Sequence, residues 1–387
     1  MKPTSLLGQL PVDKFLSEYW QKKPLLIKQA LPGFNSPVSA EELAGLACDA
    51  DVESRIVLEK DGLHPWELRS GPFQESDFAD LPETHWTLLI QDIEKHLPEL
   101  CWITDLFDFI PDWRMDDLMI SYAADQGSVG PHLDAYDVFL LQAEGKRHWK
   151  INTDTTRPLK KVSDTTLDII SNFESEQDWI VEPGDLLYLP PGVAHYGIAT
   201  GECITCSIGF RAPSHVDMVQ HFMHLILDSI KPETLYQDPL LVLQKNPHEL
   251  TKQSIQHLWK TVEQYLSASP SLINHWAGTL LSEGKQAFQA QHLEQTKPLS
   301  GFFEQWQNTG VLYKNTALKF IYMHTETGLH FYIDGQHLQY SDELLPRAEW
   351  ICASLQISWQ EFTDHADKNE LGSVFYDFYQ KGFYYFL

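Results

Sequence analysis

The stretch VGPHLDAYDVFLLQAEGKRHW, from Val129 to Trp149, contains the strand pattern and two of the side chains that decide the fold and the site of this chain. It follows a glycine-rich turn and contains runs of alternating polar and apolar residues, which are typical of β-strands. His132 and Asp134 are two residues apart, so on a strand their side chains leave the same face. This places an imidazole beside a carboxylate, a pairing suited to a metal ion.

A third candidate ligand follows at the end of the segment EPGDLLYLPPGVAH, from Glu182 to His195. This segment reads as a turn, a short apolar strand, a second turn and a histidine where another strand begins. Two histidines and one carboxylate form a facial triad, which leaves coordination positions open and suits non-haem Fe(II). The sequence therefore predicts an iron site at His132, Asp134 and His195.

The spacing His-x-Asp occurs three times and does not by itself identify the site. His215 and Asp217 lie in a segment with helical apolar spacing, where residues two apart point about 200° apart and chelate poorly. His365 and Asp367 lie in a polar segment without strand character. The CxxC pair Cys203 and Cys206 lacks a second pair for zinc and lies in an apolar strand, which favours buried packing thiols.

Composition limits the classes of function. The 387 residues suit two or three domains, and 54 acidic against 28 basic residues give a formal net charge of −26. This charge disfavours phosphate backbones and favours basic proteins as partners, although solubility alone would also explain it. We expect a cytoplasmic protein, because no signal peptide and no apolar run of about 20 residues is evident.

From Asp117 the strand signals become dense, and their Gly- and Pro-containing turns favour a sandwich or jelly roll. The predicted strands are Leu118–Tyr122, Tyr136–Gln142, Gly145–Ile151, Asp178–Val181 and Leu186–Leu189, with two more up to Phe210. After Pro213 the apolar spacing becomes helical, over Val216–Ile230, His248–Leu266 and Ser271–Phe288.

Five motifs together resemble the JmjC-type Fe(II) and 2-oxoglutarate oxygenases, and most closely their bacterial ribosomal oxygenase branch. They are Pro131–Asp134, Gly145–Arg147, Glu182–Asp185, Pro190–His195 and Gly209–Pro213. The resemblance implies an α+β protein built on a double-stranded β-helix, a cupin-like jelly roll. It implies an N-terminal α/β platform (1–116), the JmjC core (117–213), a helical dimerisation segment (214–299) and a winged-helix-like C-terminal domain (300–387).

The resemblance also implies a cosubstrate site. Fe(II) would be held by the three predicted ligands, with 2-oxoglutarate chelating it, and no further catalytic residue is expected. Arg147 would bind the far carboxylate of 2-oxoglutarate, since a guanidinium grips carboxylates bidentately; pairing with a surface carboxylate is the alternative. Ser121 matches a position that hydrogen-bonds the cosubstrate. Candidate substrate contacts are Tyr136 and Asp137, which could equally be packing and surface residues, and Asp125.

The implied reaction is hydroxylation of the β-carbon of an arginine in a large-subunit ribosomal protein, the sixteenth. Alternatives are the same chemistry on another target, by histidine hydroxylation or lysine demethylation, or a non-enzymatic cupin scaffold. The implied partners are a basic ribosomal protein and a second copy of the chain, with no membrane. Residues 301–387 carry a net charge of −6, so we expect no direct nucleic acid binding.

Overall fold

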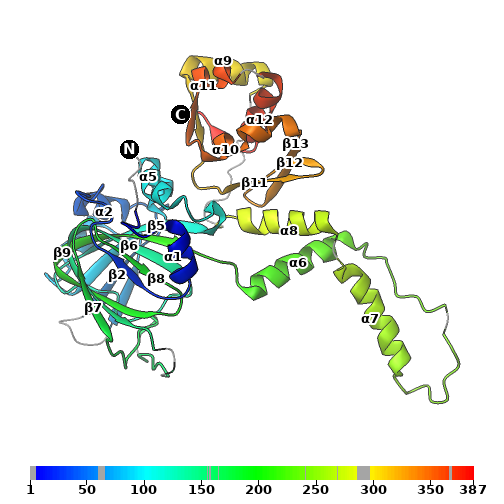
Figure 1. Ribbon diagram of the computed structural model, residues 1–387, viewed down its shortest axis with the longest axis horizontal. Coiled ribbons are helices and arrows are strands. Elements are labelled where there is room, and N and C mark those ends of the chain that lie inside the picture. Colours follow the sequence, from blue (N-terminus) through cyan, green and yellow to red (C-terminus); the bar gives the residue numbers. More distant parts are fainter. Residues whose placement is uncertain are drawn as a thin grey trace. The chain divides into compact units, whose positions relative to one another are not determined.

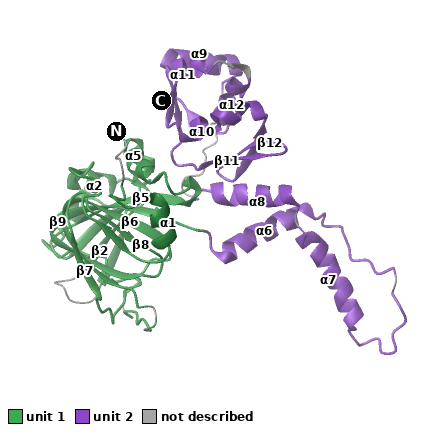
Figure 2. Ribbon diagram, viewed as in Figure 1, with its two compact units in different colours: residues 1–212 green, residues 213–387 purple. Residues whose placement is uncertain are grey.

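The computed structural model describes residues 6–59, 66–154, 156, 158–163, 165–239, 241–267, 269–285, 297–365 and 368–387. The chain divides into two compact units, Met1–Ala212 and Pro213–Leu387, coloured separately in Figure 2. The finer division into four domains stays a prediction. In the described part of the chain, no helix combines the length and the apolar character needed to cross a bilayer.

The first unit is built on a large antiparallel sheet. Among its described residues the strand order is β1-β8-β6-β9-β5-β4-β2-β3, with β7 paired to β6. Its strands are β1 (Leu25–Ile27), β2 (Ser54–Glu59), β3 (Trp66–Ser70), β4 (Trp86–Ile90), β5 (Met115–Ala123), β6 (Asp137–Asn152), β7 (Gln177–Val181), β8 (Leu186–Leu189) and β9 (Ala194–Phe210). Its helices are α1 (Val12–Glu18), α2 (Ala40–Leu46), α3 (Glu75–Ala79), α4 (Ile93–His96) and α5 (Cys101–Thr104).

Strands β6 and β9 are the long elements around which this sheet curls (Figure 1). They pair antiparallel from Asp137 opposite Phe210 to Asn152 opposite Ala194. The register shifts twice, between Gln142 and Glu144 and between Glu144 and Lys146. Because bulges bend and twist a strand pair, each strand contributes to both walls of a jelly roll.

The two faces of the curled sheet differ in what covers them. Leu118 and Ile120 of β5 belong to the largest apolar core, together with Phe15 of α1 and Leu43 of α2. Helix α2 begins after Ser39, which forms a capping box with Glu42. Met119, on the opposite face of β5, packs in a smaller cluster inside the roll. The helices thus cover the outer face and leave the inner face for a site.

The second unit begins with three helices and ends in a mixed domain. Its helices are α6 (His215–Ser229), α7 (Lys252–Leu266), α8 (Pro270–Ser282), α9 (Leu299–Thr309), α10 (Leu345–Ala353), α11 (Trp359–Asp364) and α12 (Lys368–Gln380). Its strands are β10 (Val311–Lys314), β11 (Phe320–Thr325), β12 (Gly328–Ile333), β13 (Gln336–Tyr340), β14 (Gln356–Ser358) and β15 (Tyr384–Tyr385). Helix α8 ends before the predicted Phe288, which lies outside the described residues.

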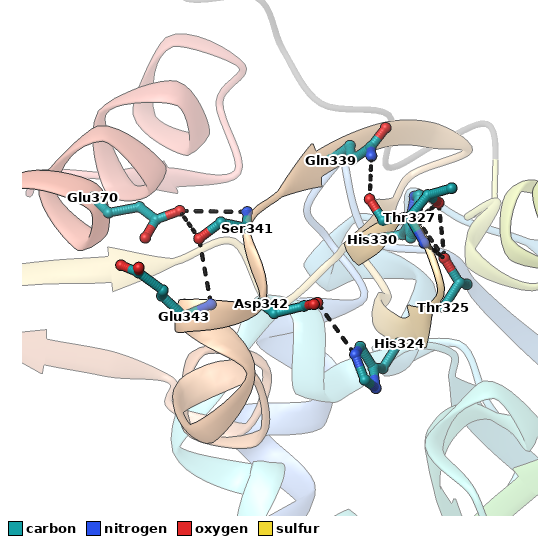
Figure 3. A network of polar contacts seen from close by, with 9 residues as sticks. All are labelled: His324, Thr325, Thr327, His330, Gln339, Ser341, Asp342, Glu343 and Glu370. Atoms are coloured by element: carbon teal, nitrogen blue, oxygen red, sulfur yellow. Dashed lines mark hydrogen bonds and ion pairs between the residues drawn. The ribbon is translucent and has the colours of Figure 1, made fainter.

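Polar contacts tie the β11–β12–β13 sheet of this unit together, as Figure 3 shows. The hydroxyls of Thr325 and Thr327 both lie 2.9 Å from the Nε2 atom of His330. His324 lies 3.1 Å from the Asp342 carboxylate, at the start of the segment that leads into α10. These contacts fix the hairpin turn and its link to the following helix.

Candidate metal and cosubstrate site

Backbone pairing brings the two predicted histidine ligands together. The His132 amide donates to the His195 carbonyl at 3.0 Å, and the His195 amide donates back to the His132 carbonyl at 2.8 Å. The ring centroids are 4.2 Å apart. Residues that are 63 positions apart in the sequence thus form an isolated antiparallel bridge at the start of β9.

Both imidazoles are oriented by hydrogen bonds from their far nitrogens. The Nδ1 atom of His132 lies 2.9 Å from the Gly130 carbonyl, and that of His195 lies 2.9 Å from the Val193 carbonyl. Because a carbonyl only accepts, each Nδ1 carries the proton and each Nε2 offers a lone pair. The Nε2 atoms of His132 and His195 lie 3.9 Å and 3.6 Å from the two carboxylate oxygens of Asp134.

These three groups fit a divalent metal ion. One possible ligand atom from each lies within 4.8 Å of the others, and no other such group occurs among the described residues. Burial raises the pKa of Asp134, and burial followed by the charge of His132 lowers the pKa of His195 well below its usual value. A neutral imidazole is a metal ligand, and a bound cation would favour the ionised carboxylate.

Arg147 projects from β6 to the inside of the roll, which settles the face that the sequence left open. It is only 3% exposed, whereas Lys146, on the other face, pairs with Glu182. Its guanidinium donates to the Thr205 hydroxyl at 3.3 Å and to the Gly197 carbonyl at 3.5 Å. Within the described chain Arg147 forms no ion pair with a carboxylate, and its Nε has no hydrogen-bond partner.

A buried cation without an anion is costly, so this arrangement points to an anionic ligand. Trp149 connects the cation to the metal ligands, since its ring lies 5.1 Å from the Arg147 guanidinium carbon and 5.8 Å from the His195 ring. Ser121 is buried on β5, and its hydroxyl donates to the Thr205 carbonyl at 3.5 Å. Thr205 therefore joins Ser121 and Arg147 in one polar cluster, a role that sequence reasoning missed.

Of the three candidate substrate contacts, Tyr136 lies at the site, whereas Asp125 and Asp137 lie elsewhere. Tyr136 is 40% exposed, and its hydroxyl hydrogen-bonds the Asp134 carboxylate. Asp125 accepts a hydrogen bond from the Gly201 amide at 2.7 Å, so its carboxylate braces a neighbouring turn.

The expectation that Asp137 lines the mouth needs correction. Its side chain is fully buried on the face of β6 that packs against the outer core. Its carboxylate accepts hydrogen bonds from Tyr188 at 2.6 Å and Gln21 at 2.9 Å, and it pairs with Arg114 at 3.1 Å. The physical reason is strand alternation, because Asp137 shares its face with Phe139 rather than with the residues that point into the roll.

Three polar residues on the inner face were missed by sequence reasoning: Arg55, Gln91 and Asp117. Asp117 is buried on β5 and acts electrostatically on the Tyr136 hydroxyl. It precedes Ser121 by four strand positions, so the two share a face. This even spacing from Ser121 could have identified Asp117 from the sequence. Arg55 on β2 and Gln91 just after β4 are far away in the sequence, and no comparable spacing pointed to them.

The other motifs stay outside the site. Asp217 caps helix α6 through Ser214, as helical spacing predicted for its segment. Asp367 lies outside the described residues. Cys203 and Cys206 are free and buried, and burial raises the pKa of both thiols. This agrees with packing thiols.

Comparisons with known proteins match this geometry. The JmjC domain family model matches residues 103–218. An Escherichia coli K12 protein named ribosomal protein uL16 3-hydroxylase is 35% identical over 271 residues, which cover 70% of this chain and 71% of that protein. A probable ribosomal oxygenase of Haemophilus influenzae is 36% identical over 67% of this chain and 62% of its own length.

Solved structures agree over nearly the whole chain. The crystal structure of E. coli YcfD has a TM-score of 0.84 and 28% sequence identity, covering 98% of this chain and 99% of that one. YcfD in complex with cobalt and 2-oxoglutarate has a TM-score of 0.81 and 27% identity, covering 97% and 98%. These matches confirm the predicted jelly-roll fold and the resemblance that the sequence motifs indicated.

Proposed function

This chain belongs to the JmjC-domain ribosomal oxygenases, and we propose that it hydroxylates the β-carbon of an arginine in ribosomal protein uL16 with Fe(II) and 2-oxoglutarate. His132, Asp134 and His195 would hold the metal, and Arg147 with Ser121 would hold the far end of 2-oxoglutarate. When bound, Fe(II) and 2-oxoglutarate would supply the oxidation of a C–H bond by dioxygen, with 2-oxoglutarate converted to succinate and carbon dioxide. The protein orients the reactants and excludes water.

The observation that carries this proposal is the buried guanidinium of Arg147, which has no carboxylate partner among the described residues and lies on the same face as the three candidate ligands. A dicarboxylic acid that chelates a metal with one end would place its other carboxylate against this guanidinium. A scaffold without a ligand would have to bear the cost of the bare cation. This asymmetry favours an enzyme over the non-enzymatic alternative.

A cationic substrate suits the acidic side of the pocket. The chain carries a net charge of −26, which hastens encounter with a basic ribosomal protein. Asp117, on the inner face, is better placed than Asp125 or Asp137 to meet a guanidinium, because it is near Tyr136 and neither of the others is free to turn inward. Tyr136 would then contact the same side chain from the metal side.

The test is incubation of the enzyme, Fe(II) and 2-oxoglutarate with purified uL16, followed by mass spectrometry of its peptides. We expect one oxygen atom added to an arginine. Oxygen on histidine, or loss of a methyl group from lysine, would move the assignment to another target. Turnover of 2-oxoglutarate that Asp134→Ala leaves unchanged would support the scaffold. A ribosomal substrate also implies a cytoplasmic location.

We also infer that two copies of the chain associate through the helical segment. Helix α7 has no buried residue, and five of its apolar side chains are exposed. They lie on one helical face: Ile255, Leu258, Trp259, Val262 and Leu266. Such a stripe requires a partner, and the same stripe on a second copy is complementary.

Light scattering tests this association. Trp259→Glu should convert a dimer to a monomer, because it places a charge in the centre of the stripe. Gln264→Glu, on the opposite face of α7, is the matched control and should stay dimeric. A wild-type protein that is monomeric at all concentrations would contradict the inference.

A further inference from the structure

A chain of polar contacts crosses three adjacent strands on the inner face of the roll. Arg55 lies on β2, Gln91 directly follows β4 and Asp117 lies on β5. Residues of the same alternation on these strands, Val57, Leu89 and Met119, pack together inside the roll. Arg55, Gln91 and Asp117 therefore face the interior that holds the candidate metal ligands.

The contacts fix the orientation of each group. The Arg55 guanidinium donates to the Gln91 side-chain oxygen at 3.0 Å, and the Gln91 amide nitrogen donates to a carboxylate oxygen of Asp117. A guanidinium has only donors, so the oxygen of Gln91 must face Arg55. Its NH₂ group is then committed to Asp117. Arg55 thus determines which end of the amide Asp117 meets.

The other side of Asp117 is shaped by the absence of a side chain. Gly209 of β9 lies opposite Asp117, and a Cβ atom there would come within 2.6 Å of its second carboxylate oxygen. The carboxylate therefore lies directly against the β9 backbone. Gln91 thus binds one carboxylate oxygen of Asp117, and the missing side chain of Gly209 makes room for the other.

The chain of contacts also reaches the metal side of the pocket. The charges of Arg55 and Asp117 both act on the Tyr136 hydroxyl, which hydrogen-bonds Asp134. Arg55 acts on Asp134 as well. A side chain that extends from Asp117 towards Tyr136 would therefore point at the candidate metal ligands.

We propose that Arg55, Gln91 and Gly209 are positioning residues that hold the Asp117 carboxylate ready to receive the cationic end of the substrate side chain. This inference rests on the proposed function and deepens it, because it assigns the preference for a guanidinium to the contacts behind Asp117. None of the three positioning residues touches the reacting carbon. Their removal should affect recognition of the charge rather than the oxidation step.

The test uses full-length enzyme and short overlapping uL16 peptides that contain either a central arginine or its neutral isostere citrulline. Gln91→Met and Arg55→Met keep side-chain bulk and remove the hydrogen bonds, and Gly209→Ala displaces the carboxylate without removing a polar group. Arg69→Met is the matched control, since Arg69 lies on neighbouring β3 and its partner among the described residues is Glu67. Peptide affinity is measured with Mn(II) in place of iron, and KM and kcat with Fe(II).

We expect each of the three variants to raise the KM and the dissociation constant for the arginine peptide roughly tenfold, the size of one charge-assisted hydrogen bond. For Gln91→Met and Gly209→Ala, the values for the citrulline peptide, kcat, and succinate formed without peptide should change less than about twofold. Arg55→Met also removes a charge that acts on Asp134, so for this variant the ratio between the two peptides is the measured quantity. Arg69→Met should match the wild type in every measurement.

Two results would overturn the positioning role alone: variants that discriminate arginine from citrulline as well as the wild type does, or equal losses on both peptides together with lower thermal stability. The second result would mean that the contacts only tie strands together. A wild type that binds both peptides alike and adds no oxygen to uL16 would instead reject the proposed substrate and this inference with it.

Discussion

Two arginines of the same unit, the partly buried Arg114 and the fully buried Arg147, have opposite surroundings. Arg114 lies against the outer core, where its guanidinium pairs with the fully buried Asp137 at 3.1 Å. Tyr188 and Gln21 also donate to this carboxylate. Among the described residues, Arg147 on the inner face meets a hydroxyl, a carbonyl and the face of Trp149, and no carboxylate.

The difference separates a charge that belongs to the fold from one that belongs to a ligand. Arg114 and Asp137 compensate each other's desolvation, and two neutral donors complete the site. The desolvation of Arg147 is compensated only in part by the protein. The inner face therefore gives up stability that a bound carboxylate can return.

The largest expected effect is on the inner face. Asp134→Ala should lower 2-oxoglutarate turnover by at least about a hundredfold, because even partners of metal ligands commonly contribute that much. The free energy of unfolding of the metal-free protein should hardly change, since no cation is then left unpaired. Succinate formation and chemical denaturation measure the two quantities. Full turnover in this variant would remove the metal from the inner face.

Asp137→Ala tests the ion pair of Arg114 in the outer core. It should lower the free energy of unfolding by about 3–5 kcal/mol, because it leaves Arg114 without its anion. Asp168→Ala, which breaks an exposed pair with Lys161, should cost at most about 1 kcal/mol. Urea denaturation measures both. Equal effects from the two variants would show that burial does not distinguish these pairs.

Arg147→Met sharpens the comparison further. Affinity for 2-oxoglutarate should fall roughly a hundredfold, with loss of a charge-assisted pair of hydrogen bonds. In the absence of ligand the variant should be at least as stable as the wild type, since a bare buried cation is gone. Thermal melting with and without 2-oxoglutarate provides the measurement. Arg147→Lys is the control, and it should retain part of the ligand-induced stabilisation.

The smallest expected effect is on the free energy of unfolding at Glu94, and it depends on pH. Burial raises its pKa to about 7, although its carboxyl accepts a hydrogen bond from the Leu118 amide. The native state therefore keeps a proton that the unfolded chain releases above its usual pKa near 4.5, so stability falls as the pH rises from there to about 7.

Glu94→Gln should thus be more stable than the wild type by about 1–3 kcal/mol near neutral and alkaline pH, with the difference disappearing in acid. Denaturation at several pH values checks this. A constant difference across the range would show that the charge of Glu94 is not responsible.

The sequence predicted the three candidate metal ligands that the structure brings together, because a His-x-Asp spacing on a strand, a turn and a distant histidine fall within recognisable motifs. It also predicted the buried thiols of Cys203 and Cys206. It misplaced Asp137, because alternation separates two faces without saying which of them is covered by helices. Arg55 and Gln91 gave no signal, since the register of β2, β4 and β5 brings them together and register depends on long-range pairing.

The register shifts in β6 change which residues face inward, the even-numbered or the odd-numbered ones. Before them, even-numbered residues such as Leu140 and Gln142 face inward, and after them odd-numbered Arg147 and Trp149 do. Loss of the extra residue from the bulge would therefore restore strict alternation and leave Arg147 facing inward. A one-residue insertion between the intact bulge and Arg147 would instead put Lys146 inside the roll and turn the proposed cosubstrate anchor out into solvent, with every functional side chain still present in the sequence.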